Sequence, residues 1–248
     1  MSDKPATLMS GNAGHFAPFS VYTIAPENWG KAAAAKRFLG CAFPVGDDGS
    51  FATCSHVVSG IDAKFEMMVV QHPTETVCHK ISLPILHPKH DFAIFKIDSK
   101  TPHWPAPILG ELMLATDVFA YGYYDTVVED GNVVTIPQIS AGIITATPRR
   151  FKMKLATILP FYQLSFPALV GFSGSPLFAK IDGENYALAG MIFGNVSSEI
   201  VERYVTETAD MNSKIIEKTS RIWESGVAHT ATAMAAFASA IGCKIWNH

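Results

Sequence analysis

The stretch that decides the fold is Leu169-Val170-Gly171-Phe172-Ser173-Gly174-Ser175-Pro176-Leu177-Phe178. Its central serine lies between two glycines, and a proline and two apolar residues follow. Glycine adopts backbone angles that a Cβ forbids, so such a turn can present the Ser173 hydroxyl and aim backbone N–H groups at one point, where an oxyanion can develop. Taken alone, the run also fits an ordinary Gly/Ser loop between two strands. The choice depends on whether a base and a carboxylate accompany it.

A histidine and an aspartate stand beside predicted strands. Residues 37–45 and 51–58 flank a turn sequence rich in Asp, Gly and Ser, which predicts a hairpin with His56 at the end of its second strand. Asp91 directly precedes an alternating apolar run. A histidine at the rim of a core and an aspartate that starts a strand are both common structural features, so each residue alone is a weak indication.

Strand-like runs rich in β-branched and aromatic residues recur along the chain and predict an all-β protein. We expect strands at 16–24, 37–45, 51–58, 67–71, 78–86, 92–97, 118–123, 132–136, 138–144, 161–166, 177–180, 186–195 and 221–229. The polar segment Ser197–Ser220 is expected to be partly helical. Thr230 is placed to cap a C-terminal helix that ends at Gly242 and whose apolar residues have helical spacing.

The composition excludes several classes of function. Hydrophobic residues make up 48% of the 248 residues and charged residues 17%, which is typical of a globular protein with a large core. A net charge of −3 provides no electrostatic basis for binding nucleic acid. Residues 1–14 lack the layout of a secretory signal, and no run approaches the ~18 apolar residues of a membrane span. We therefore expect a cytoplasmic protein without a membrane partner, a trimmed signal being the alternative.

The four cysteines contain no C-x-x-C pair and match no metal-ligand spacing. In a reducing compartment Cys41, Cys54, Cys78 and Cys243 are expected to be buried thiols. Cys41 and Cys54 face each other across the predicted hairpin, so a disulfide between them stays open. No metal and no cofactor are expected.

His56, Asp91 and Ser173 together are a much stronger indication than any one of them. A serine hydroxyl is a poor nucleophile unless a base lies within hydrogen-bond reach. Imidazole is that base near pH 7, and a carboxylate fixes its tautomer and stabilises the imidazolium. The backbone N–H groups of Gly171 and Ser173 are the candidate donors to the oxyanion. The three side chains therefore predict acyl transfer.

Three motifs resemble the trypsin/chymotrypsin-like serine peptidases, and within them the bacterial HtrA/Deg-type protease domain. They are Thr53-Cys54-Ser55-His56-Val57-Val58, Asp91-Phe92-Ala93-Ile94-Phe95-Lys96-Ile97 and Gly171-Phe172-Ser173-Gly174-Ser175-Pro176-Leu177. Residues 140–144 and 226–228 match more weakly, and the resemblance spans residues 36–242. It implies two six-stranded antiparallel Greek-key barrels with the site in the cleft between them. The expected parts are a flexible tail (1–15), two barrels (16–108 and 109–229) and a C-terminal helix and tail (230–248).

The resemblance also implies a serine endopeptidase with a protein or peptide as substrate, and a role for each matching residue. Ser173 corresponds to the nucleophile, His56 to the general base and Asp91 to the orienting carboxylate. The oxyanion hole corresponds to the N–H groups of Gly171 and Ser173. The implied substrate-binding residues are Pro167, Ala168, Phe193, Gly194 and Asn195. Because neither 165–170 nor 193–195 contains an acidic residue, we expect a small or medium apolar residue before the cut, although Phe193 is large enough to narrow the pocket.

The sequence departs from the family pattern at several points. Phe172 stands where digestive enzymes carry an Asp that pairs with a newly cut N-terminus, so that activation switch is not expected. Ser175 replaces the more frequent Gly, and Val57 replaces a disulfide-forming Cys. Only 75 residues (248 − 173) follow Ser173, so a PDZ domain is not expected.

Two other interpretations remain. An α/β-hydrolase elbow requires Gly at the place of Ser175, a helix directly after it, and a βαβ pattern, none of which is present here. A protease-like fold that acts as a non-catalytic binding or regulatory module is the second alternative, because the polar segment 197–220 is long enough to dock a partner or cover the cleft. A regulatory partner or a homo-oligomer, and gating of the cleft, are therefore left open.

Overall fold

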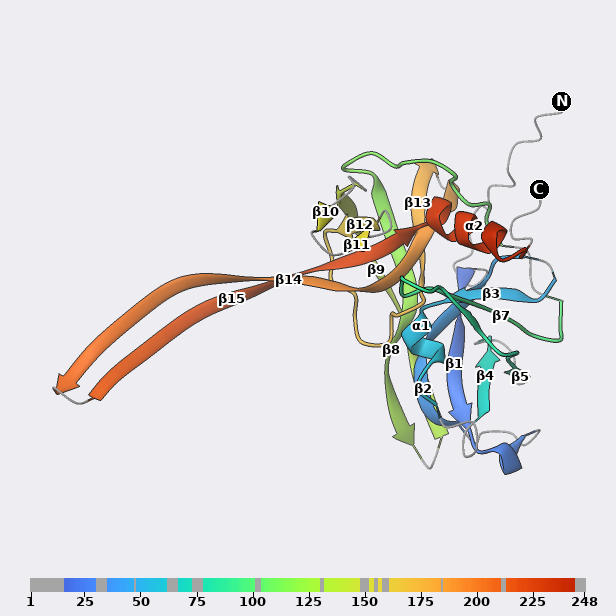
Figure 1. Ribbon diagram of the computed structural model, residues 1–248, viewed down its shortest axis with the longest axis horizontal. Coiled ribbons are helices and arrows are strands. Elements are labelled where there is room, and N and C mark those ends of the chain that lie inside the picture. Colours follow the sequence, from blue (N-terminus) through green and yellow to red (C-terminus); the bar gives the residue numbers. More distant parts are fainter. Residues whose placement is uncertain are drawn as a thin grey trace.

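The computed structural model describes residues 16–29, 35–46, 48–61, 67–72, 78–100, 104–129, 132–147, 152–153, 156–157, 161–183, 185–210 and 213–243. The predicted tail at 1–15 lies outside these ranges, and the division of the chain at residue 108 stays a prediction. The described residues form two β-sheet halves and a C-terminal helix (Figure 1). None of the helices in these ranges has the length and hydropathy needed to cross a membrane.

The N-terminal half is one curved antiparallel sheet in the order β5-β4-β1-β2-β3-β7-β6. Its strands are β1 (Phe19–Ile24), β2 (Ala35–Pro44), β3 (Ser50–Thr53), β4 (Met67–Gln71), β5 (His79–Lys80), β6 (Ile85–Leu86) and β7 (Ala93–Lys96). β5 pairs with β4 and β6 pairs with β7, and between them Ile81 bridges Ile97. Residues 79–86 therefore act as one interrupted strand that brings the two edges of the sheet together.

The C-terminal half is a closed barrel in the order β12-β15-β14-β13-β8-β9. Its strands are β8 (Asp117–Glu129), β9 (Asn132–Ala146), β12 (Phe161–Leu164), β13 (Pro176–Asp182), β14 (Asn185–Asp210) and β15 (Ser213–Thr230), and a separate hairpin joins β10 (Lys152–Met153) to β11 (Ala156–Thr157). The expected all-β, trypsin-like fold with a six-stranded C-terminal barrel and a C-terminal helix is confirmed. The expected first six-stranded barrel is instead a seven-stranded sheet, because two short strands, β5 and β6, stand in place of one continuous strand.

The two larger clusters of buried side chains occupy the two halves, and one of them also joins the halves. The larger cluster fills the N-terminal sheet and extends onto the barrel through Phe178 and Met191, and onto the C-terminal helix through Met234 and Phe237. The smaller cluster fills the barrel interior. Since one core crosses the boundary, side chains from both halves can be held at fixed positions at their junction.

The C-terminal helix α2 (Ala231–Ala240) begins where the sequence predicts it. The Ala233 N–H donates to the Thr230 hydroxyl oxygen over 3.1 Å, which satisfies one of the free N–H groups of the first turn. Gly242 follows with a φ of +70°, the left-handed conformation that ends many helices. The predicted cap and stop are confirmed.

Three local predictions are wrong. The expected strand at 51–58 ends at Thr53, and α1 (Ser55–Val58) makes one helical turn that carries His56. The expected strands at 132–136 and 138–144 are one strand, β9, with Pro137 inside it. Proline is tolerated there because, among the described strands, β9 pairs with β12 only near Ile144, and none pairs with its other edge at Pro137. The expected strand 78–86 is broken into β5 and β6.

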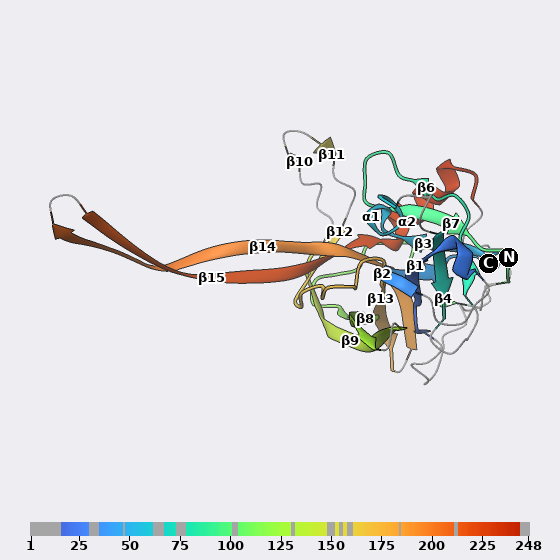
Figure 2. The same ribbon diagram turned by 90° about the horizontal axis from the view of Figure 1, so that it is seen from below.

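The largest correction concerns segment 197–220. It is not partly helical: β14 and β15 pair in antiparallel register from Gly190↔Thr230 to Asp210↔Ser213. Figures 1 and 2 show the distal part of this hairpin, residues 196–225, projecting away from the body as a long arm. The polar composition of the segment concealed this pairing. In this structure the arm does not lie over the junction of the two halves, and docking of a partner on it stays a prediction.

Candidate active site

His56 reaches the junction of the two halves from the N-terminal sheet. The helical turn α1 follows β3, and its apolar residues Val57 and Val58 are buried in the core. The Ser55 hydroxyl donates to the Phe92 carbonyl over 2.7 Å, which ties this turn to the chain beside Asp91. Buried valines on one side and this bond on the other leave the imidazole half exposed, with 50% of its side chain accessible.

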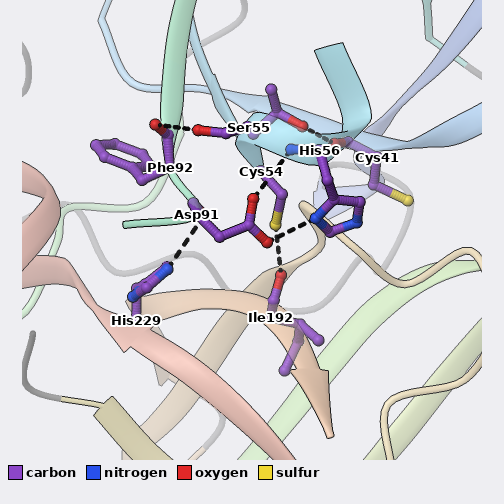
Figure 3. Close-up of polar contacts among 9 residues, drawn as sticks. Cys41, Cys54, Ser55, His56, Asp91, Phe92, Ile192 and His229 are labelled. Atoms are coloured by element: carbon purple, nitrogen blue, oxygen red, sulfur yellow. Dashed lines mark hydrogen bonds and ion pairs between the residues drawn. The ribbon is translucent and has the colours of Figure 1, made fainter. Parts of the chain in front are cut away.

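Asp91 holds His56 with both carboxylate oxygens. Oδ2 lies 2.6 Å from His56 Nδ1, and Oδ1 accepts the His56 backbone N–H over 3.0 Å (Figure 3). Burial by itself raises the pKa of the Asp91 carboxyl, but the hydrogen bonds from His56 outweigh it and leave the pKa below its ordinary value. An ionised Asp91 accepts the Nδ1 proton, so the Nε2 lone pair of His56 is directed away from the carboxylate.

The serine loop is attached to β14 by a pair of backbone hydrogen bonds. The Gly174 N–H donates to the Ile192 carbonyl over 2.9 Å, and the Ile192 N–H donates to the Ser175 carbonyl over 2.9 Å. Phe172 is fully buried in the barrel core, where its ring anchors the loop from behind. Phe172, which stands where the digestive enzymes carry an aspartate, is therefore a buried core residue in this chain.

The backbone of Ser173 lies against the N-terminal half, next to the turn that carries His56. The Cys41 N–H of β2 donates to the Ser173 carbonyl over 2.8 Å. A Cβ on Gly40 would come within 2.7 Å of that carbonyl and 2.8 Å of a Val57 methyl, so only glycine permits this approach. Among the hydrogen bonds of the described residues, none joins the Ser173 hydroxyl to the His56 ring. Such catalytic bonds are often long in structures without substrate.

Residues 169–172, directly before Ser173, form a β-turn of a defined type. The Phe172 N–H donates to the Leu169 carbonyl over 3.0 Å, and Gly171 has a φ of +93° whereas Val170 does not have a positive φ. This combination is a type II turn, which requires glycine at its third position. Within the described part of the chain, the N–H groups of Gly171 and Ser173 donate to no carbonyl. They remain available to a negatively charged oxygen.

Cys54 is a buried neighbour of His56 and Asp91. Ligand atoms of these three residues lie within 4.8 Å of one another, which is close enough for a metal ion. However, burial raises the pKa of the Cys54 thiol well above its ordinary value, and the thiol donates to the Ile192 carbonyl over 3.3 Å. Metals bind the thiolate, and Asp91 already holds His56 Nδ1, so the group fits a hydrogen-bonded cluster better than a metal site.

All four cysteines are free, so the disulfide left open between Cys41 and Cys54 is absent. These two thiols are buried as expected, but Cys78 and Cys243 are only partly buried. Burial raises the pKa of the Cys41 thiol to about 11. The Cys41 thiol donates to the Gly171 carbonyl over 3.4 Å and supports the serine loop as a small packed side chain.

His229 is a residue that our sequence analysis did not assign to the site. It is 4% exposed on β15, and its Nε2 donates to the Asp91 carbonyl over 3.2 Å (Figure 3). Its ring stacks on Phe193 at a centroid distance of 4.1 Å. His229 therefore joins the barrel to Asp91 across the junction. The available signal was a histidine between Ala228 and Thr230 in the buried end of β15, residues 225–230.

Acidification is expected to destabilise the fold through His229. Burial lowers its pKa from 6.5 to about 4, and the positive charges of His90 and His87 act in the same direction, against Asp91. Between these two values the unfolded chain binds a proton that the folded chain does not. At 1.36 kcal/mol per pKa unit, the free energy of unfolding should fall by on the order of 3 kcal/mol from pH 7 to pH 4.

Urea unfolding at several pH values measures this loss, and His229→Gln is the comparison because it keeps an N–H donor without the proton uptake. The depressed pKa of Asp91 acts in a lower window, below its ordinary value of 3.8, and does not mask the effect. If wild type and His229→Gln lost the same free energy between pH 7 and pH 4, the assignment of this loss to His229 would be wrong.

Comparison with known proteins identifies the class. Residues 40–188 match the family described as the trypsin-like peptidase domain, and a search of curated proteins gives no match. The match covers more than half of the chain, so this protein belongs to the trypsin-like peptidase family.

Solved structures agree in fold. The Rv3671c protease from M. tuberculosis in its active form has a TM-score of 0.59 at 17% identity, over 98% of this chain and 93% of that chain. The MamO protease domain from Magnetospirillum magneticum (apo form) gives 0.55 at 16% identity, over 91% and 98%. The HtrA-type protease AlgW with a decapeptide gives 0.56 at 20% identity, over 93% and 67%. The expected family, with HtrA-type proteases among the structural neighbours, is confirmed.

Proposed function

We propose that this protein is a serine endopeptidase that hydrolyses peptide bonds through His56, Asp91 and Ser173. The observation that carries the proposal is the double attachment of His56 to Asp91, at 2.6 Å through the ring and 3.0 Å through the backbone. This arrangement orients one imidazole nitrogen toward the carboxylate and leaves the other as a base. The Ser173 backbone is bonded to Cys41 on the same side of the junction, which supports Ser173 as the nucleophile.

In the proposed reaction, Ser173 Oγ bonds to the carbonyl carbon while its proton passes to His56 Nε2. The resulting oxyanion accepts hydrogen bonds from the N–H groups of Gly171 and Ser173, a role supported by the type II turn. His56 then donates the proton to the leaving amine as the C–N bond breaks. Water hydrolyses the acyl-enzyme ester with His56 again as base, and Ser173 is regenerated.

The substrate backbone is proposed to pair with the exposed edge of Phe193, Gly194 and Asn195, as an added strand. β14 is irregular here, with a register shift between Ile192 and Gly194. Pro167 and Ala168 lie opposite this edge, since the Asn195 side chain bonds directly to Ala168. The residue before the cut therefore lies between these two segments.

One observation favours the alternative of a non-catalytic binding module, namely the long arm of β14 and β15. An isolated two-stranded hairpin is only marginally stable in water, so a partner that covers it is physically reasonable. The two functions differ in whether Ser173 reacts.

A fluorophosphonate probe decides between them. The native protein is expected to form one adduct, mapped by peptide mass spectrometry to Ser173 and not to the exposed Ser99, and the heat-unfolded protein none. The contrast arises because only a hydroxyl paired with a base attacks phosphorus at neutral pH. No adduct on the native protein, or an adduct at another residue, would contradict the proposed function and favour the binding module.

A further inference from the structure

We propose that the Asn195 side chain closes the substrate pocket next to Ser173, so that only very small residues, Gly, Ala or Ser, are accepted before the cut. The inference rests on the proposed function and deepens it by naming a substrate class. It concerns the space between the serine loop and β14, where the side chain of the residue before the cut must lie.

Two hydrogen bonds carry the inference. The Ala168 N–H donates to Asn195 Oδ1 over 2.6 Å, and Asn195 Nδ2 donates to the Ala168 carbonyl over 2.9 Å. The side-chain amide thus satisfies both backbone groups of one residue, as a neighbouring strand would. This reciprocal pair spans the whole distance from β14 to the segment that leads into the serine loop.

The position of this bridge follows from the loop geometry. Gly174 and Ser175 are bonded to Ile192, so the residues after Ile192 run beside the residues that precede Ser173. A substrate whose carbonyl carbon meets Ser173 Oγ, and whose backbone pairs with 193–195, directs its side chain into the gap between these segments. Asn195 and Ala168 cross this gap.

The segment that carries Ala168 forms the wall of the gap and is also packed tightly against β15. The Gly226 N–H of β15 donates to the Phe166 carbonyl over 2.7 Å. A Cβ on Gly226 would lie 2.8 Å from that carbonyl and 3.2 Å from the Ala168 nitrogen, so the wall segment is packed directly on β15. Neither the bridge nor this wall leaves depth for a long side chain. Entry of one would break both bonds of Asn195 and leave the Ala168 N–H and carbonyl without these partners.

The test uses peptide amides that differ only in the residue before the cut, Ala, Val, Leu or Phe. For the wild type, kcat/KM is expected to be highest for Ala and about 100-fold lower for Leu and Phe, since a closed pocket rejects each added carbon. Asn195→Ala removes the bridge and should raise the Phe-to-Ala ratio of kcat/KM at least about 10-fold. Asn185→Ala is the matched control, because Asn185 is bonded to Asp182 in the β13–β14 turn and should keep the wild-type ratio.

The outcomes separate this inference from the proposed function. A wild type that forms the Ser173 adduct but cleaves after Phe or Leu as well as after Ala overturns the closed pocket alone. The same holds if Asn195→Ala is folded and active with an unchanged ratio. If Asn195→Ala fails to fold, the wild-type profile still decides. A native protein that forms no adduct overturns the proposed function, and this inference with it.

Discussion

Replacement of Ser173 by Ala is expected to reduce kcat on a peptide amide with Ala before the cut by about 10⁶-fold. Without the hydroxyl no acyl-enzyme forms, and the oxyanion donors alone leave only a small residual rate. The fold should be unaffected, because the Ser173 hydroxyl makes no hydrogen bond within the described residues and its backbone contacts are kept. We expect the free energy of unfolding to stay within about 0.5 kcal/mol of wild type.

Steady-state kinetics at equal concentrations of folded protein measure this change, and Ser99→Ala is the matched control. The Ser99 hydroxyl is exposed and, among the described residues, bonds only to the neighbouring Lys100 carbonyl, so its loss should leave kcat at the wild-type value. Substantial activity of Ser173→Ala would mean that another group attacks the substrate, and the proposed mechanism would have to be abandoned.

The change Asp91→Asn is expected to lower kcat by about 10⁴-fold near neutral pH while the fold is retained. Asn has the shape of Asp, so the 3.0 Å bond to the His56 backbone N–H can persist. Its amide, however, donates to His56 Nδ1 in place of accepting from it. The ring proton then lies on Nε2, and the nitrogen that faces the substrate is no longer a base.

The matched control is Asp48→Asn in the turn between β2 and β3. Asp48 forms an exposed ion pair with Lys96, so its replacement should cost less than about 1 kcal/mol of stability and leave kcat unchanged. Retention of more than about a tenth of the wild-type kcat by Asp91→Asn would show that the carboxylate does not set the tautomer of His56.

Several features were predictable because they depend on local chemistry. The helix cap at Thr230 and the positive φ angles of the glycines on either side of Ser173 depend on the conformational preferences of single residues. The pairing of His56 with Asp91 was predictable from their combination with a Gly-flanked serine, since acyl transfer requires all three groups.

Other features depend on cross-strand and tertiary contacts, and no short stretch of the sequence predicts them. The polar segment 197–220 was expected to be part helix, yet its two halves pair with each other in the β14–β15 arm, since cross-strand contacts can outweigh the low strand propensity of a polar segment. Pro137 seemed to end a strand, but the free edge of β9 accommodates it. His229 lies at the site because its ring donates a hydrogen bond to the carbonyl of Asp91, a residue 138 positions away.

The amino-acid sequence by itself determined the family, the β architecture and the three residues proposed for catalysis, because nucleophile, base and carboxylate are residue types with distinct local settings. Only the tertiary structure decided that His229 joins β15 to Asp91 and that Asn195 bridges to Ala168. The physical reason is that a buried or bridging polar side chain acquires its role from the acceptor it meets across the fold, and that partner is set by packing and not by its neighbours in the chain.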